Sequence, residues 1–463
     1  MRAETMTLDI ARLHYDDGDF FAKVRALRNP QTSAQTAAAA KVADIISRVR
    51  GGGYAALCDI SAKLDGAVND DEVCITLDDK ARADIMAKAD VKLLAALQTA
   101  AERLREYHRR QLPKEWQKER HKERAKEHPQ ECYQQWQFAD DDGNILGERA
   151  SPVERAMIYA PGGKAAYPSS VLMGVIPAKV AGVNDVCVST PARGGEVNNA
   201  VLLAAAVAGA DSVWKFGGAQ AVAAFAFGCA PVPRADIIAG PGNVYVSEAK
   251  RQLFGEVGLD SIAGPSEVMI IFDKGANPQW VAADLIAQAE HDEDAVCIGI
   301  CDCDVDAVYD ALAAQLKTTP RKAIAARALT KGGALITARD ICQCCEIANA
   351  FAPEHLQVMC QDADAIAEKI TTAGAVFVGA QTPVAFGDYC AGTNHVLPTG
   401  GSARFFSPLS ARHFIRRTSF FRASPKGAAK LSKTTATIAD AEGFYAHSHS
   451  ALLRGDDNNN NKR

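Results

Sequence analysis

Length, composition and charge place the chain among globular proteins with more than one domain. Its 463 residues exceed the roughly 100–200 residues of a typical single domain, and its 48% hydrophobic and 23% charged residues exclude a disordered or fibrous protein. The formal net charge of -5 gives no electrostatic reason to expect nucleic acid as a partner.

The sequence also argues against targeting and membrane-spanning segments. The first twenty residues are polar and acidic, and the longest apolar run, residues 200–210, is shorter than the roughly 20 residues of a membrane helix. Thirteen cysteines, an odd number, favour reduced core residues over a disulfide framework. The CxxC spacing of Cys342 and Cys345 lacks a second pair, so helix-core cysteines are favoured over a structural zinc site. The sequence predicts a cytoplasmic protein.

The part of the chain before about residue 130 is predicted to be mostly helical. Lys, Arg and Glu alternate between Glu102 and His128, which indicates a solvated helical face and not an RNA-binding surface. Asp142 and Gly143 then predict a hairpin-type turn, after which the hydrophobic pattern changes.

From residue 156, short apolar strands alternate with helices in two series. The first series has predicted strands at 157–160, 186–190, 213–216 and 236–239 and helices at 169–183, 199–210, 220–228 and 244–254. The second has strands at 267–273, 295–301, 334–337, 356–360 and 375–379 and helices at 278–291, 305–316, 338–351 and 363–372. This alternation requires crossover connections and hence mostly parallel sheets covered on both faces. In such sheets ligands are expected at the loops that follow strands.

The fold class is therefore α/β, with two incomplete Rossmann-like doubly wound units plus helical N- and C-terminal segments. The C-terminal segment, from about residue 405, is basic and predicted to be helical. Four asparagines near the end predict a disordered tail.

Glycine turns occur in place of a GxGxxG fingerprint, which neither series contains. They lie at residues 160–163, 217–220, 240–243 and 264–267, mostly directly after a predicted strand. Backbone amides at such turns can hold a phosphate or carboxylate, so several converging turns can cradle a nucleotide. For any single turn, the need for a tight bend explains the glycines equally well.

Imidazole, acidic and amide side chains gather at the ends of predicted elements. Gln288 and His291 are three residues apart and project from one helix face, where they can present two ligands to a metal, although a histidine at a helix end is more often a cap or surface residue. Glu354 and His355 adjoin each other between a helix and a strand. They can both accept protons near neutral pH, or they form a solvated loop pair.

Two further groups follow later in the chain. Asp388 and His395 lie beyond the strand at 375–379, and Glu442 and His447 are five residues apart. Either Gly443 breaks the helix between the latter two, or they have different functions. Together these His, Asp and Gln residues suit a zinc site with an open position for substrate, but their spacing leaves the reaction open.

Long motifs then identify a family resemblance. Between about residues 24 and 454 the sequence resembles histidinol dehydrogenases. The motifs, in chain order, are IYAPGGKAAYPSSVLM, FGGAQAVAAFAFG, GPGNVYVSEAKR, AGPSEV, DLIAQAEH, APEHL, GDYCAGTNHVLPTGG and AEGFYAH. The resemblance implies a zinc-dependent enzyme that converts L-histidinol, two NAD+ and water to L-histidine and two NADH through bound L-histidinal, at the end of histidine biosynthesis.

The resemblance also implies roles for individual residues. Glu354 and His355 match the two catalytic proton acceptors of the family. One zinc ion per subunit would be held by Gln288, His291, Asp388 and His447. The NAD contacts would be Tyr159, Gln220 and Asn243. The substrate contacts would be Ser266, Gln288, His291, His355, Asp388, Glu442 and His447.

Domain organisation and assembly follow from the same resemblance. The expected protein is a homodimer in which the C-terminal segment of one subunit completes the other's site, so that His447 acts in trans. The expected parts are residues 1–50 (N-terminal helical segment with dimer contacts), 51–156 with 266–404 (first Rossmann-like domain, with the metal and catalytic residues), 157–265 (inserted second Rossmann-like domain, with the NAD contacts), 405–454 (C-terminal helical segment) and 455–463 (disordered tail).

Three other functions share part of this pattern. A paralogous dehydrogenase would oxidise another small polar alcohol such as a sulfonated diol, but Glu442 and His447 would then lack the imidazole that they are expected to accommodate. A zinc hydrolase would use Glu354 to activate water and would not bind NAD. A non-enzymatic zinc scaffold is disfavoured because proton acceptors and metal ligands occur together.

Overall fold

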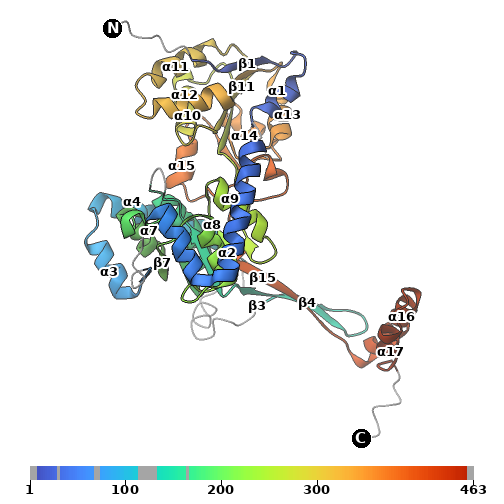
Figure 1. Ribbon diagram of the computed structural model, residues 1–463. Helices are drawn as coiled ribbons and strands as arrows, with labels where there is room; N and C mark the ends of the chain where they lie inside the picture. The colour runs from blue at the N-terminus through green and yellow to red at the C-terminus, as the bar shows by residue number, and fades with distance from the viewer. Residues whose placement is uncertain (1–7, 29–31, 67–72, 113–132, 163–165, 456–463) are drawn as a thin grey trace. The chain divides into compact units, whose positions relative to one another are not determined.

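The computed structural model of the chain describes residues 8–28, 32–66, 73–112, 133–162 and 166–455. It consists of two compact units (Figure 1). Unit 1 comprises Met1–Gln111 and Glu154–Phe414, and unit 2 comprises Leu112–Val153 and Ile415–Arg463. Unit 1 contains two sheets, named A and B below, and unit 2 contains a third, sheet C.

Sheet A is parallel and has the strand order β1-β12-β11-β10-β13-β14. Its strands are β1 (Ala11–His14), β10 (Glu267–Phe272), β11 (Val296–Cys301), β12 (Gly333–Thr337), β13 (His355–Met359) and β14 (Ala375–Val378). Along β10, Val268 and Ile270 belong to one hydrophobic core and Met269 and Ile271 to another. A strand buried on both faces needs a continuous apolar run, which is why this segment was predictable.

Helices cover both faces of sheet A. The core that contains Val268 is formed with α10 (Pro278–Ala289), α11 (Asp306–Leu316) and α12 (Lys322–Gly332). The core that contains Met269 is formed with α1 (Phe20–Ala26), α13 (Ile341–Phe351) and α14 (Ala363–Ala367). After β14 the chain forms α15 (Val384–Tyr389) and the 3-10 turns η3 (Ser402–Arg404) and η4 (Ala411–Phe414).

Sheet B has the strand order β2-β7-β6-β5-β8-β9, parallel except for the pairing of β2 with β7. Its strands are β2 (Cys74–Thr76), β5 (Arg155–Tyr159), β6 (Asp185–Ser189), β7 (Ser212–Trp214), β8 (Ile237–Ala239) and β9 (Gly258–Leu259). Met157 and Tyr159 face a core shared with α2 (Thr32–Asp65), α8 (Gly218–Phe227) and α9 (Val244–Leu253).

The opposite face of sheet B carries helix α6 (Pro168–Ala181), whose Gly174 allows a close approach to β5. A Cβ at Gly174 would lie 2.2 Å from Cγ2 of Ile158. The neighbouring elements are α3 (Asp79–Ala87), α4 (Val91–Arg109), α7 (Asn199–Ala208) and the 3-10 turn η2 (Arg193–Gly195). Sheet B is thus also a doubly wound unit.

Unit 2 is built on antiparallel sheet C, with the strand order β15-β4-β3. Strands β3 (Tyr133–Ala139) and β4 (Ile145–Pro152) form the hairpin predicted at Asp142 and Gly143, and β15 (Ile415–Arg422) pairs with β4. Helices α16 (Pro425–Ala441) and α17 (Tyr445–Leu452) follow. Gly443, at φ +78°, separates them, so the helix between Glu442 and His447 is broken.

The predicted fold class is confirmed, with corrections to its parts. Both chain ends contain strands as well as helices. These strands were not predicted, because the short β1 and the basic β15 lack the apolar runs by which strands were recognised. The segment 51–156 does not all join residues 266–404, since β2 lies in sheet B and β3 and β4 lie in sheet C. Helix α12 was not predicted, and α14 ends at Ala367 and not at residue 372. The other domain bounds stay predictions.

Some predictions lie outside the described residues. They concern Gly163 of the first glycine turn, residues 113–128 of the charged stretch and the tail from residue 456. Among the helices that are described, none has the length and apolarity to cross a membrane.

Candidate active site

The three predicted NAD contacts lie where strands of sheet B end. Tyr159 is the last residue of β5, Gln220 lies in the first turn of α8 after β7, and Asn243 caps α9 after β8. The Tyr159 hydroxyl accepts a hydrogen bond of 3.0 Å from the amide of Gly218, and burial raises the pKa of Tyr159 to about 12. Because β7, β6, β5 and β8 are consecutive in the sheet, these residues share its carboxyl edge, as expected for a ligand site.

Two of these residues have features that suit a nucleotide. Gln220 is 1% exposed, and within the described part of the chain its Oε1 has no hydrogen-bond partner. Asn243 is exposed, and its Oδ1 accepts hydrogen bonds from the amides of Tyr245 and Val246. A buried acceptor without a partner is costly, so a ligand that donates a hydrogen bond to Gln220 would satisfy it.

A buried ion pair holds the glycine turn at residues 240–243. Lys250 and Asp260 are both 2% exposed in their side chains and contact each other. The Gly240 amide donates a 2.8 Å hydrogen bond to Asp260, and Lys250 donates a 3.1 Å hydrogen bond to the Gly240 carbonyl. Both polar groups of Gly240, three residues before Asn243, are therefore fixed.

The predicted catalytic residues lie at the amino edge of sheet A. His355 is the first residue of β13, and Ser266 directly precedes Glu267, the first residue of neighbouring β10. The predicted catalytic pair therefore precedes its strand, whereas Asp388 follows β14, as was expected of ligand-binding loops. In sheet A the predicted residues Ser266 and Glu354 lie on the loops that lead into β10 and β13, whereas the predicted NAD contacts of sheet B follow its strands.

Glu354 and His355 form a buried pair around the backbone of Glu267. Glu354 Oε2 accepts a 2.8 Å hydrogen bond from the Glu267 amide, and His355 Nδ1 lies 2.9 Å from the Glu267 carbonyl. The two side chains approach to 3.5 Å. Because a carbonyl only accepts hydrogen bonds, Nδ1 carries a proton. In the neutral ring Nε2 is then the basic nitrogen, and among the described residues it has no hydrogen-bond partner.

Burial and charge shift the pKa values of this pair. Burial raises the pKa of Glu354 to about 7, against the opposing effect of the neighbouring His355. For His355 burial lowers the pKa, but the negative charges of Glu354 and Asp388 outweigh it and raise the pKa to about 9. The pKa values of both groups therefore lie within about two units of neutral pH, as is typical of groups that exchange protons in catalysis.

Asp388 lies opposite this pair, near the end of α15. Its Oδ1 is 3.6 Å from Nε2 of His355. Burial would raise the pKa of Asp388, but the imidazoles of His355, His395 and His291 lower it overall. The structure therefore brings Asp388 into the electrostatic range of His291, and Gln288 lies one turn before His291 on α10, which packs against α15.

The loop after α15 is tied to the helices that cover sheet B. His395 Nδ1 lies 2.8 Å from the Asp388 carbonyl, and its Nε2 lies 3.3 Å from the hydroxyl of Ser170 on α6. Asn394 donates a 2.8 Å hydrogen bond to the carbonyl of Met173 and lies 3.2 Å from Nε2 of His108 on α4. Polar groups of α4 and α6, two helices that cover sheet B, thus contact the loop that follows α15.

Glu442 and His447 belong to unit 2. Glu442 caps the C-terminal end of α16, His447 lies in the first turn of α17, and both side chains are exposed. The bend at Gly443 separates the two helices that carry them.

The predicted zinc ligands in unit 1 have donor atoms of the types that zinc binds. Among the described residues, no group of three or more His, Cys, Asp and Glu side chains is arranged to hold a metal. The predicted ligands in unit 1 are, however, one amide, one imidazole and one carboxylate, and the fourth ligand, His447, lies in unit 2. An amide and a carboxylate oxygen with imidazole nitrogen form a mixed set that zinc accepts. The exposed side chain of His291 is accessible to such an ion.

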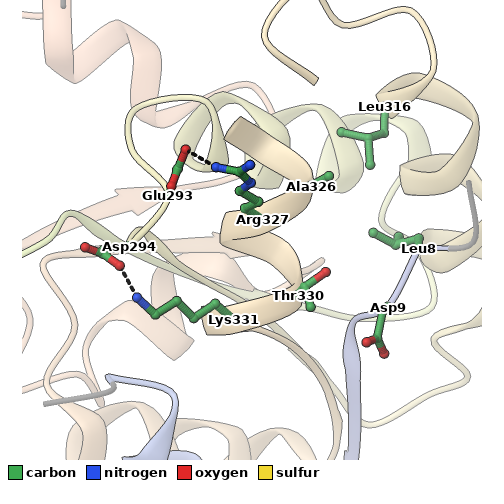
Figure 2. Close-up of a pocket in the computed structure, with 9 residues that line it drawn as sticks. All are labelled: Leu8, Asp9, Glu293, Asp294, Leu316, Ala326, Arg327, Thr330 and Lys331. Atoms are coloured by element: carbon green, nitrogen blue, oxygen red, sulfur yellow. Dashed lines mark hydrogen bonds and ion pairs between the residues drawn. The ribbon is translucent and has the colours of Figure 1, made fainter. Parts of the chain in front are cut away.

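A surface cavity of about 430 Å³ lies elsewhere on unit 1 (Figure 2). Four of its charged side chains form two ion pairs, Glu293 with Arg327 and Asp294 with Lys331. None of the predicted site residues is among those that line it, which are Leu8, Asp9, Glu293, Asp294, Leu316, Ala326, Arg327, Thr330 and Lys331. We do not include it in the candidate active site.

Sequence reasoning missed two residues at the centre of the site, Glu267 and Arg28. Glu267 holds Glu354 and His355 through its backbone, and its carboxylate pairs with Arg28. The only sequence signal was the position of Glu267 in a glycine turn. Arg28 lies 239 residues away and had none.

Comparisons with known proteins identify the family of the chain. The family model described as histidinol dehydrogenase matches residues 28–455. Histidinol dehydrogenase of Chromobacterium violaceum is 44% identical over 450 residues, which cover 96% of this chain and 99% of the relative. That of Pseudomonas aeruginosa is 42% identical over 452 residues, which cover 97% and 98%.

A solved structure extends the likeness to three dimensions. The crystal structure of histidinol dehydrogenase from Elizabethkingia anophelis has a TM-score of 0.82 and 31% sequence identity, with 96% of this chain and 98% of that chain covered. The resemblance inferred from the motifs is confirmed. The chain belongs to the histidinol dehydrogenase family of oxidoreductases.

Proposed function

We propose that the chain is a zinc-dependent, NAD-dependent dehydrogenase that oxidises L-histidinol through bound L-histidinal to L-histidine, at the end of histidine biosynthesis in the cytoplasm. One observation carries the proposal. The buried proton acceptors Glu354 and His355 adjoin each other opposite Asp388, and within the described chain the basic Nε2 of His355 has no hydrogen-bond partner. Oxidation of an alcohol to a carboxylate releases protons in both steps, and these two groups can accept them.

Residues of this chain would hold both cofactors. Tyr159, Gln220 and Asn243 would contact NAD, which when bound supplies the hydride acceptor for both oxidations. Gln288, His291 and Asp388, with His447, would hold one zinc ion per subunit. When bound, zinc would orient the substrate and, by neutralising Asp388, would favour the neutral form of His355.

The two proton transfers are assigned to different residues. In the first oxidation, Nε2 of neutral His355 accepts the proton of the substrate alcohol, while the hydrogen bond from Nδ1 to the Glu267 carbonyl keeps the ring in the required tautomer. In the second, the carboxylate of Glu354 accepts a proton from the water that adds to the aldehyde. Glu354 suits this step because its raised pKa, about 7, makes it a better proton acceptor than an ordinary carboxylate.

The substrate is expected to contact Ser266, Gln288, His291, His355 and Asp388 in unit 1, and Glu442 and His447 in unit 2. We propose that the latter two come from the second subunit of a homodimer. Unit 2 supports an assembly because it exposes large apolar side chains, which in an isolated chain would face water. They include Phe421, Ile438, Phe444, Tyr445 and Leu453, each more than half exposed.

The test is the amount of NADH formed per L-histidinol consumed by the purified protein with zinc and NAD. Two NADH per L-histidinol, lost on chelation and in His355→Asn, are the expected result. No turnover of L-histidinol, with NADH formed from another small polar alcohol, would instead indicate a paralogous dehydrogenase. The absence of NAD binding would indicate a hydrolase.

A further inference from the structure

We propose that the ion pair between Arg28 and Glu267 positions the two proton acceptors, Glu354 and His355. The inference rests on the proposed function, because it assumes that these two residues accept the protons. Arg28 and Glu267 do not face the substrate in this scheme and act through the backbone.

One residue, Glu267, fixes both proton acceptors. Its amide donates to Glu354 Oε2 at 2.8 Å, and its carbonyl accepts from Nδ1 of His355 at 2.9 Å. A rotation of this peptide segment would displace both side chains together. It would also remove the interaction that decides which nitrogen of His355 is basic.

The side chain of Glu267 is fixed in turn by Arg28. The contact is bidentate, with Nε of Arg28 2.7 Å from Oε1 and Nη2 2.9 Å from Oε2. The amide of Gly400 donates to the same Oε1 at 3.1 Å. The Glu267 side chain is 3% exposed, and a buried, bidentate pair of this kind has a defined geometry.

Arg28 also holds the turn that leads into β13. Its Nη2 donates a 3.0 Å hydrogen bond to the carbonyl of Ala352, and its guanidinium lies 3.6 Å from the ring centroid of Phe351. Ala352 has φ +54°, a left-handed conformation that residues other than glycine rarely adopt. Only Pro353 separates it from Glu354. Arg28 thus contacts the start of β10 and the approach to β13 at once.

A role in positioning Glu354 and His355 explains the pair of Arg28 and Glu267 better than a contribution to the free energy of unfolding does. Buried ion pairs often contribute no more to stability than apolar residues of similar volume, because desolvation offsets the attraction between the charges. The geometry of the pair, in contrast, cannot be reproduced by apolar side chains. Small displacements of catalytic groups are known to reduce rates strongly.

The experiment compares Arg28→Lys and Arg28→Met with wild type, His355→Asn and the control Arg327→Met. Arg327 also pairs with a glutamate, Glu293, but on the surface. For each protein, kcat, KM for L-histidinol and NAD, zinc per subunit and the thermal unfolding midpoint are measured. We expect kcat to fall about 10-fold in Arg28→Lys and about 100-fold in Arg28→Met. KM values and zinc content should stay within about threefold of wild type, and Arg327→Met should behave as wild type.

A double variant, Arg28→Met with Glu267→Met, separates positioning from stability. It leaves no buried charge unpaired, so its thermal midpoint should recover relative to Arg28→Met. If the pair positions the proton acceptors, kcat stays low despite this recovery. Recovery of kcat together with the midpoint would show a purely structural role and would overturn the inference, as would wild-type kcat in Arg28→Lys and Arg28→Met.

The His355→Asn variant keeps the inference distinct from the proposed function. If His355→Asn retains turnover, the assignment of His355 as a proton acceptor is wrong, and the inference fails with it. If His355→Asn is inactive but both Arg28 variants keep wild-type kcat, only the inference fails. Should Arg28→Met not fold, Arg28→Lys retains the charge, and its kcat decides the question.

Discussion

His108 is a buried side chain whose hydrogen bonds require a neutral ring. It is 0% exposed, its Nδ1 lies 2.8 Å from Oε1 of Gln111, and its Nε2 lies 3.2 Å from Nδ2 of Asn394. An amide NH2 cannot accept a hydrogen bond, so a proton on Nε2 would face a second donor. Burial lowers the pKa of His108, and the hydrogen bond to Gln111 opposes this only in part.

The lowered pKa of His108 predicts a loss of stability in acid. Above its usual pKa of 6.5, the ring is neutral in both the folded and the unfolded chain. As pH falls below that value, the unfolded chain takes up a proton that the folded chain resists, so the free energy of unfolding decreases. One such group contributes at most about 1.4 kcal/mol per pH unit. The measurement is the thermal midpoint at pH 7.5 and 5.5.

Variants of His108 identify the contribution of this group. His108→Gln should lose less stability between the two pH values than wild type, whereas His14→Gln, a change at an exposed histidine, should not alter the difference. An equal loss in His108→Gln and wild type would assign the acid sensitivity to other residues.

Glu354 and His355 predict separable defects in the two oxidations. Because Glu354 is assigned to the water step only, Glu354→Gln should keep the first oxidation and slow the second by about 10²–10⁴-fold. A single-turnover experiment should then give one NADH per L-histidinol at early times, against two for wild type. If Glu354→Gln still forms two NADH at the wild-type rate, Glu354 is not the proton acceptor of the second step.

The turn between β8 and α9 is stabilised by one residue of α9 and one that follows β9. Lys250 on α9 and Asp260 after β9 hold both polar groups of Gly240, which has φ +113°, and a Cβ at Gly240 would lie 2.4 Å from the Tyr159 carbonyl. The turn therefore depends on glycine and on this buried pair for its shape. Asn243, a predicted NAD contact, is the last residue of this turn.

Asp260→Asn tests this dependence. The change leaves the charge of Lys250 buried without a counter-charge, which should lower the free energy of unfolding by about 3–5 kcal/mol. We also expect weaker NADH binding, measured by fluorescence titration below the unfolding temperature, with unchanged zinc content. Glu293→Gln removes an exposed pair and should cost less than about 1 kcal/mol. NADH affinity that stays at the wild-type value would show that the pair does not shape the cofactor site.

Elements of the two doubly wound units were predictable because their central strands are buried on both faces. Strands such as β10 and β11 are unbroken apolar runs, so they stand out between helices of longer period. Strand β15, with the sequence IRRTSFFR, is paired on one edge and mostly exposed, so its composition did not distinguish it from a basic helix. Strand β2 has three residues, too few for any periodicity.

Residues of the candidate site were predictable where side chains of suitable chemistry lie close together in the sequence. Glu354 and His355 are adjacent in sequence, and Gln288 and His291 share a helix turn, so spacing alone drew attention to them. Arg28 and Glu267 meet only through the fold, across 239 residues. The sequence placed Glu354 and His355 directly before a strand, but no local pattern could show that Asp388 lies 3.6 Å from His355.

At the scale of the whole molecule, the predicted exchange of segments makes subunit complementation possible. The readout is L-histidine formation, which His447→Ala alone should not support and which Glu354→Gln alone should support only very slowly, because that variant stops after the first oxidation. If His447 acts in trans, a mixed dimer has one site with both Glu354 and His447 intact. After unfolding and refolding of an equal mixture, random pairing should restore about a quarter of the wild-type sites. Activity no higher than that of the separate variants would place His447 in the same subunit as the site that it completes.

Removal of zinc is predicted to affect turnover and not the fold. The predicted ligands in unit 1 lie on α10, on α15 and just after the end of α10, beside a hydrophobic core that includes residues of both helices. A chelator should therefore abolish NADH formation while the thermal midpoint changes by only a few degrees. Activity should return on addition of zinc. Unfolding on chelation would show instead that the metal is structural.

The pairing of β1 with β12 has a consequence for synthesis on the ribosome. Residues 11–14 cannot take their place in sheet A until residues 334–337 have been made, which at usual elongation rates takes roughly 15 to 65 seconds. During that time the nascent segment has unsatisfied backbone groups that other chains can pair with. Arg12 and His14, the exposed residues of β1, place polar side chains on this strand and would discourage such pairing before the protein is complete.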